Sequence, residues 1–319
     1  MEDSSLHWSQ KQEAVSSYKS LAAYLKASQF LPIFVLKIII LFISIYFFCT
    51  SKSDRLFSKD FLARVARITG KPRKNSLIHL MSFALYLVEK MESWSGKISF
   101  KKIQFQDDDV HQLVQQLEQG RGATLICSHL GNAELLRALA ELDRTGVSRR
   151  IPTISIVDFS VSPHFFRMIE EVNPESMHHI ISARDIGPDT VIILKQHIEE
   201  GGLVVIAGDR TSATTINSFF NLPFLGDSAP FASGPFILSM ILEAPCYSVF
   251  GLRNRTISLF PKYKMFVNRL DVPQRTSRKE RKAVAQQIAH QFSSRLERLA
   301  MEYPYQWYNF YNFWAEPTL

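Results

Sequence analysis

The spacing of apolar residues predicts helices in the first third of the chain. The run Leu31–Cys49 is apolar throughout apart from Lys37. The segments Phe57–Ile68 and Ser76–Ser93 carry apolar residues three and four positions apart, and a short stretch with glycine and proline separates them. These patterns predict one strongly apolar helix followed by two amphipathic helices.

Beyond about residue 98, short apolar segments alternate with amphipathic ones. The segments that predict strands are Ile98–Phe105, Ala123–Ser128, Pro152–Val157, His178–Ile181, Leu203–Gly208, Cys246–Arg253 and Thr256–Tyr263. The segments that predict helices are Val110–Glu118, Ala133–Leu142, Pro163–Glu171, Pro188–Glu199, Phe231–Leu242 and Ser277–Glu302. Runs such as ATLICS and LVVIAG are continuously apolar, as parallel strands buried on both faces are. We therefore expect an α/β fold with a mostly parallel mixed sheet flanked by helices, whose reactive groups gather at the carboxyl ends of the strands.

The run Leu31–Cys49 is just long enough to cross a hydrocarbon core of about 30 Å at about 1.5 Å per residue. Lys37 lies about two turns from its start, so its ammonium can reach the near interface. A cleaved signal peptide is disfavoured because a long polar segment precedes the run and no small-residue cleavage site follows it. A lipoprotein signal would need small residues before Cys49, where Phe47 and Phe48 stand. A buried helix of a soluble protein remains the alternative.

Cations are concentrated after this run, at Lys52, Arg55, Lys59, Arg64, Arg67, Lys71, Arg73 and Lys74. The positive-inside rule then places the body of the protein in the cytoplasm. The formal net charge of +7 suits nucleic acid, an anionic membrane surface or an acidic partner, and does not choose among them.

We expect an amphipathic segment over 1–30, a transmembrane helix over 31–49, a helical linker over 50–97 and an α/β domain over 98–319. The spacing of the cysteines fits neither a zinc site nor a disulfide framework, because Cys49, Cys127 and Cys246 are far apart.

The segment ATLICSHLGNAELLRALA holds the residues with the clearest chemistry. His129 follows a buried strand, Gly131 makes a turn, and Asn132 is a good N-cap for a helix whose first turn contains Glu134. Across the turn, His129 and Glu134 can fold back onto each other. A carboxylate on one ring nitrogen would fix the tautomer and leave the other nitrogen to take a proton from a hydroxyl. The plainer alternative is that His129 ends the strand and Glu134 complements the helix dipole.

The stretch SHLGNAELLRAL resembles the His-x4-Asp/Glu signature of the lysophospholipid acyltransferase superfamily, in particular its bacterial lipid A biosynthesis (lauroyl/myristoyl) branch. Other segments that look like that branch are His7–Trp8, Glu13, Arg55, Phe61–Leu62, GGLVVIAGDR at 201–210 and PYQWYNFYNFW at 304–314. Two features depart from it. Arg210 stands where many of these enzymes have Gln, and the C-terminal segment resembles a less characterised branch, which leaves the acceptor open.

The resemblance implies an O-acyltransferase in which His129, poised by Glu134, acts as a general base. The donor would be an acyl thioester of acyl carrier protein or coenzyme A, and the acceptor a hydroxyl of a lipid or glycolipid. It implies a protein of the bacterial inner membrane whose catalytic domain faces the cytoplasm. We expect no metal, cofactor or nucleic-acid partner.

Further candidates surround the same predicted edge of the sheet. Asp209 and Arg210 directly follow the strand LVVIAG, so they should face the same crevice as His129. Arg210 is suited to a substrate phosphate, although an Asp–Arg surface pair is the alternative. Ser128, Gly131 and Asn132 are expected to contact substrate or orient His129, with simple capping as the alternative for Asn132.

Some segments keep two interpretations. In the resembling family, the region matching 216–242 helps to form the acyl channel, whereas here it also suits ordinary core. The aromatic residues Trp307, Tyr308, Tyr311 and Trp314 suit either an interfacial belt or closure of the core.

Two other functions compete with acyl transfer. A serine hydrolase such as a thioesterase needs a nucleophile elbow, and the nearest match, Gly226–Pro230, has proline where glycine is required. A non-catalytic lipid-binding protein would not need His129 and Glu134.

Overall fold

The computed structural model describes residues 30–94, 98–107, 109–135, 147–158, 166–167, 170, 179–211, 218–273, 276–277 and 279–315. Most of the expected helices Ala133–Leu142 and Pro163–Glu171 lies outside these residues, as does nearly all of the N-terminal segment 1–30.

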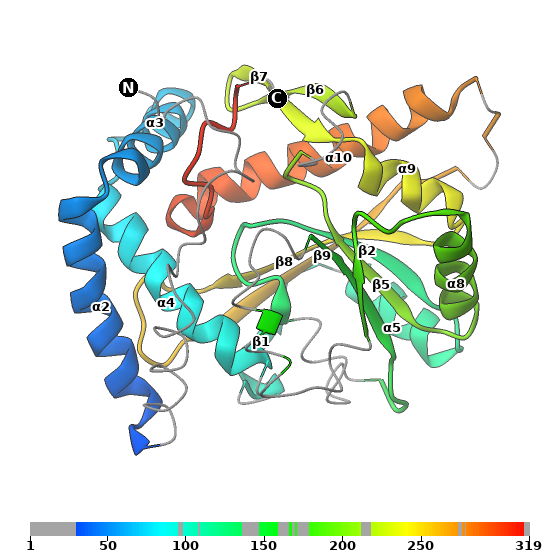
Figure 1. The fold of residues 1–319 in the computed structure, drawn as a ribbon, viewed down its shortest axis with the longest axis horizontal. Coiled ribbons are helices and arrows are strands. Elements are labelled where there is room, and N and C mark those ends of the chain that lie inside the picture. The colour runs from blue at the N-terminus through cyan, green and yellow to red at the C-terminus, as the bar shows by residue number, and fades with distance from the viewer. Residues whose placement is uncertain are drawn as a thin grey trace.

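Three helices gather at one side of the molecule (Figure 1). They are α2 (Ile33–Thr50), α3 (Lys52–Thr69) and α4 (Ser76–Trp94), which confirms the helices expected from the apolar spacing. Helix α3 ends at Gly70, whose φ of 66° gives the left-handed conformation that glycine adopts without strain. Helix α2 packs against α4, and among the described residues it is the one helix long and apolar enough to cross a membrane.

A seven-stranded sheet forms the centre of the body, in the order β1-β9-β8-β2-β5-β3-β4. In that order the strands are Ile103–Phe105, Tyr263–Leu270, Cys246–Arg253, Ala123–Cys127, Leu203–Ala207, Thr153–Val157 and Ile180–Ser182. Neighbouring strands are parallel except β8 and β9, which are antiparallel. The expected fold class, α/β with a mostly parallel mixed sheet, is confirmed.

Helices cover both faces of the sheet (Figure 1). They are α5 (Asp109–Glu118), α8 (Pro188–Glu199), α9 (Gly234–Ile241) and α10 (Arg281–Glu302). Alternate residues of β2 enter different cores: Ile126 packs in the cluster that contains Phe236 of α9 and Phe292 of α10, whereas Leu125 joins the cluster that contains Leu113 of α5. Since successive side chains point to opposite faces, the apolar run of β2 reflects burial on both sides.

One predicted strand is wrong, and one predicted helix begins later than expected. The expected strand Thr256–Tyr263 is the connection between β8 and β9, closed by a hydrogen bond from Asn254 N to Lys262 O, and strand β9 only begins at Tyr263. The helix expected over Phe231–Leu242 is shorter than expected, because α9 begins at Gly234 and the residues before it are extended. Strands β6 (Phe219–Phe224) and β7 (Asp227–Ala232) form an antiparallel hairpin there. Apolar residues at this spacing fit a strand and a buried helix equally well, so periodicity alone could not separate them.

Candidate active site

His129 and Asp209 meet because neighbouring parallel strands end in register. Cys127 at the end of β2 lies opposite Ala207 at the end of β5. His129 and Asp209 each follow two residues later, at the carboxyl edge of the sheet. His129 Nδ1 is 2.8 Å from Asp209 Oδ1, and the backbone N–H of His129 donates to Asp209 Oδ2 at 2.9 Å. The sheet therefore presents an imidazole held through both its ring and its backbone.

The Asp209 carboxylate is fully buried and accepts a further hydrogen bond from Trp307 Nε1 at 3.4 Å. Burial alone would raise its pKa. The His129 ring, the Arg210 guanidinium and the hydrogen bond from the His129 backbone outweigh burial and lower the pKa of Asp209 below its ordinary value. Asp209 is thus ionised at neutral pH and can only accept hydrogen bonds, so the hydrogen of a neutral His129 ring must lie on Nδ1.

The His129 side chain is 31% exposed, and the described residues provide no hydrogen bond to its Nε2. Burial and then the nearby Arg210 guanidinium lower the pKa of His129, and these effects exceed the opposing influence of Asp209. The imidazole is therefore neutral at neutral pH, with its lone pair on Nε2. This arrangement is suited to accepting a proton from a substrate hydroxyl.

Glu134 is not the partner of His129 Nδ1, in contrast to the contact expected from the sequence. Its carboxylate instead lies 3.7 Å from Lys90 Nζ of α4, and both side chains are partly exposed. The Nδ1 position is occupied by Asp209 because the register of β2 and β5 delivers that carboxylate directly. The sequence indicated part of this pairing, because His129 and Asp209 each follow a buried apolar run. The order of the strands in the sheet, which the sequence did not show, makes these two runs neighbours.

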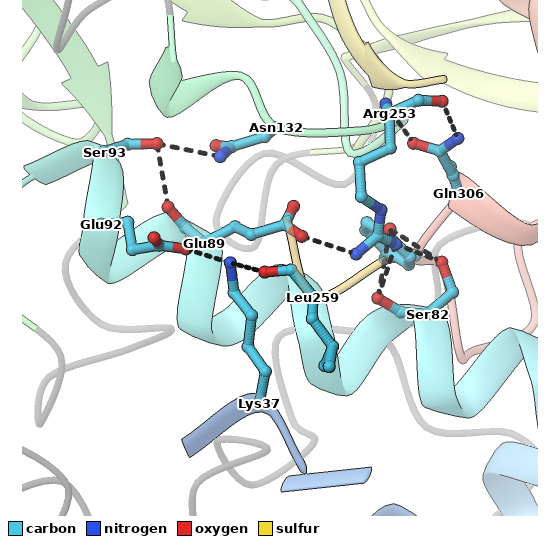
Figure 2. Close-up of polar contacts among 10 residues, drawn as sticks. Lys37, Ser82, Glu89, Glu92, Ser93, Asn132, Arg253, Leu259 and Gln306 are labelled. Atoms are coloured by element: carbon cyan, nitrogen blue, oxygen red, sulfur yellow. Dashed lines mark hydrogen bonds and ion pairs between the residues drawn. The ribbon is translucent and has the colours of Figure 1, made fainter. Parts of the chain in front are cut away.

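The turn after His129 requires glycine. Gly131 has a φ of 76°, and a Cβ atom at this position would lie 2.2 Å from the carbonyl oxygen of Gly251. Ser128 Oγ accepts a hydrogen bond from Leu130 N at 3.1 Å. Asn132 is buried, and its side-chain amide donates to Ser93 Oγ of α4 at 2.9 Å (Figure 2). Ser128, Gly131 and Asn132 thus shape and hold the turn that carries His129.

The C-terminal segment pairs with this turn. Trp307 forms an antiparallel bridge with Leu130, and Tyr308 N donates to the carbonyl of His129 at 3.0 Å. His79 of α4 lies 2.9 Å from the Trp307 carbonyl through Nε2, and burial lowers the pKa of His79 to about 4, so this ring is a neutral structural group. Trp307 and Tyr308 are buried, so they close the core and do not form an interfacial belt.

Arg210 lies beside Asp209 and faces the same C-terminal segment. Its Nε donates to Asn309 Oδ1 and a terminal nitrogen donates to the Tyr308 carbonyl, both at 3.3 Å. Because a guanidinium only donates, Oδ1 of Asn309 must face Arg210. The Nδ2 atom of Asn309 is buried and finds no partner among the described residues. Sequence reasoning missed Asn309, which had no feature except its place in the aromatic C-terminal segment.

A buried arginine ties this segment to the rest of the body (Figure 2). Arg253, at the end of β8, is 3.0 Å from a Glu89 oxygen of α4 and donates to the Tyr308 hydroxyl at 2.8 Å. Its backbone N–H donates to Gln306 Oε1 at 2.8 Å, while Gln306 Nε2 donates to its carbonyl at 2.9 Å. Gln306 O in turn accepts from Gly131 N. Arg253 therefore links α4, the sheet and the turn that carries His129.

Among the described residues, no group of three or more His, Cys, Asp and Glu side chains is placed to hold a metal ion.

We expect Arg253→Met to lower the free energy of unfolding by about 3–5 kcal/mol, because it leaves Glu89 as a buried charge without its partner. Lys195→Met is the matched control. It breaks the exposed ion pair between Lys195 and Glu243 and should cost at most about 1 kcal/mol. Urea denaturation followed by circular dichroism measures both, and equal losses for the two variants would contradict the role assigned to Arg253.

A scan against protein-family models found no match to this chain, and a search of curated proteins found none.

Proposed function

We propose that the protein is a membrane-associated O-acyltransferase. It moves a fatty acyl group from a thioester of acyl carrier protein or coenzyme A to a hydroxyl of a lipid or glycolipid. The observation that carries this proposal is the neutral His129 ring, whose Nδ1 is held by the buried Asp209 and whose Nε2 has no partner among the described residues. The His-x4-Glu signature around His129 supports the same chemistry.

In the proposed reaction, His129 Nε2 takes the proton of the acceptor hydroxyl as its oxygen attacks the thioester carbonyl. The buried Asp209 carboxylate stabilises the imidazolium that forms. When the tetrahedral intermediate collapses, the carbon–sulfur bond breaks and the thiolate leaves with the proton from Nε2. The products are an ester and a free thiol, and His129 returns to its neutral form. No acyl-enzyme is needed.

Two cations near His129 suit the charges of such substrates. The positive charges of Arg210 and Lys90 both lower the pKa of the His129 ring, so both cations act on the site electrostatically. Acyl donors of both kinds carry the acyl chain on a phosphate-containing arm, and an arginine fork is well matched to phosphate oxygens. We assign Arg210 to a substrate phosphate or to the negative charge that develops on the thioester oxygen.

Helix α2 attaches the protein to the membrane in this proposal. Its apolar composition supports this attachment, and the cations that follow it favour the cytoplasmic face of a bacterial inner membrane. The body would then meet soluble acyl donors on one side and lipid acceptors at the bilayer.

Replacing His129 with Ala should lower turnover by at least about 10²-fold, the lower range for loss of a general base. The assay is transfer of a labelled acyl chain from acyl carrier protein or coenzyme A to extracted membrane lipids. Intact-lipid mass spectrometry of cells carrying wild-type or His129→Ala protein then identifies the acceptor. A loss of less than about threefold would remove His129 from the mechanism, since it lies well below that range.

We expect Asp209→Asn to lower kcat by about 10²–10⁴-fold. The Asp209 oxygens accept from both the backbone N–H and the ring Nδ1–H of His129. An asparagine has one oxygen, so its NH₂ group must face one of these two donors, and the Nδ1–H tautomer of the His129 ring is disturbed. Glu134→Gln is the matched control. It removes a carboxylate from a part-exposed ion pair, and its effect should stay below about 10-fold. If Glu134→Gln were the more damaging variant, Asp209 would not be the group that orients His129.

The pH dependence follows from the direction of the His129 pKa shift. The neutral ring is the active form and its pKa is lowered from 6.5, so log kcat/KM should fall only below pH 6.5 in the wild-type protein. Arg210 lowers this pKa, so Arg210→Gln should move the acidic limb to higher pH, whereas Arg210→Lys keeps the charge and should move it less. An acidic limb that does not respond to the charge at position 210 would contradict this electrostatic account.

A further inference from the structure

Helix α2 has two different faces. Lys37 and Ser44 are buried seven positions apart, on one side of the helix, and Lys37 contacts Glu92 of α4. The other side exposes large apolar residues, namely Phe34, Ile38, Ile39, Phe42, Ile43, Ile45, Tyr46 and Phe47. A helix surrounded by lipid would have no reason to bury a lysine on one side, so α2 is built to meet a protein surface and an apolar phase at once.

Lys37 fixes α2 to the body near the start of the helix (Figure 2). Its side chain is 1% exposed, its Nζ lies 2.6 Å from a Glu92 oxygen of α4, and it also donates to the Leu259 carbonyl at 3.3 Å. The ammonium therefore points into the body. The expectation that it reaches a membrane interface is wrong.

The opposite end of α2 is capped by the helix that follows it. Arg55 of α3 donates to the carbonyl oxygens of Phe48 and Cys49, which are among the unpaired acceptors of the last helical turn. With 18 residues, α2 is about 27 Å long. The start of α2 contacts the connection between β8 and β9 through Lys37 and Phe34, so α2 cannot cross a hydrocarbon core without taking that part of the α/β domain into lipid or across it.

The connection beside the start of α2 is unsuited to the interior of a bilayer. The connection between β8 and β9, which contacts Lys37 through the Leu259 carbonyl, exposes the cations Arg255 and Lys262. The same connection exposes Phe260, whose ring centroid is 6.2 Å from that of Phe34 in α2. An apolar surface thus continues from α2 onto this connection, with exposed cations beside it.

We infer that α2 does not span the bilayer but lies in the plane of one leaflet, with the N-terminal segment and the body on the same side. The apolar face of α2, here defined as Phe34, Ile38, Phe42, Tyr46 and the adjoining Phe260, inserts among the acyl chains. The occupant of this surface is a bilayer containing anionic lipid. Exposed cations complement the anionic headgroups at both ends of α2. They are Arg255 and Lys262 near the start of the helix, and Lys52 and Lys59 beyond its end.

In this arrangement, helix α4 connects the lipid-facing helix α2 to the candidate active site. Glu92, which holds Lys37, is followed by Ser93, the partner of Asn132 in the turn that carries His129. The inference rests on the membrane attachment of the proposed function but not on acyl transfer.

The sidedness of two cysteines in the full-length chain tests the inference. In a Cys49→Ser background, Ser4→Cys reports the N-terminal side of α2 and Lys262→Cys reports the body. The buried thiols of Cys127 and Cys246 have raised pKa values and should stay unlabelled. The reagent is a membrane-impermeant maleimide, applied to right-side-out and to inside-out bacterial membrane vesicles. Both cysteines should be labelled in one of these preparations and neither in the other. Labelling from opposite sides would overturn the inference.

Depth in the bilayer supplies the second measurement. A bimane on Phe42→Cys or Ile38→Cys should be quenched by nitroxide lipids in vesicles containing phosphatidylglycerol. Ile193→Cys is the matched control, because Ile193 is an equally apolar, exposed residue on α8, at the other side of the molecule (Figure 1). Equal quenching at the α2 positions and at 193, or none at the α2 positions, would contradict insertion of this face. A His129→Ala protein should give the same results, so failure of the acyl-transfer proposal would remain distinguishable.

Discussion

The register of two neighbouring parallel strands places the groups on which the site depends. Strands β2 and β5 end side by side, and the residues two positions beyond their last pair are His129 and Asp209. A fully buried carboxylate that keeps its charge needs donors, and the ring, the backbone of His129 and the Trp307 indole provide them. The same hydrogen bonds that make this burial tolerable also set the tautomer of His129 and direct its lone pair to Nε2.

The surrounding structure keeps this pair in place through contacts from distant parts of the chain. The C-terminal segment pairs with the turn after His129, and the buried Arg253 connects that segment to Glu89 of α4. Helix α4 also contacts the turn through Ser93 and holds α2 through Glu92. A single helix therefore joins α2, the helix proposed to enter the membrane, to the residues proposed for catalysis.

The sequence was most informative where one physical requirement dominates. Continuous apolar runs such as Cys246–Arg253 predicted buried strands, and the Pro188–Glu199 helix has the bounds that its periodicity indicated. The glycine turn after His129 was also visible, because Gly131 must adopt a positive φ. The partner of His129 was not visible, since a carboxylate five residues away in the chain appears closer than one eighty residues away until the strand order is known. The inward direction of Lys37 likewise depends on Glu92, which belongs to a different helix.

The protonation of the His129 ring is the most direct test of the account. Nitrogen-15 NMR spectra of protein whose histidine rings carry nitrogen-15 distinguish the two neutral tautomers. The His129 signals are identified by their loss in His129→Gln. We expect hydrogen on Nδ1 at neutral pH, unchanged in Glu134→Gln and disturbed in Asp209→Asn. A ring protonated on Nε2 in the wild-type protein, or a tautomer that depends on Glu134 and not on Asp209, would contradict the central claim.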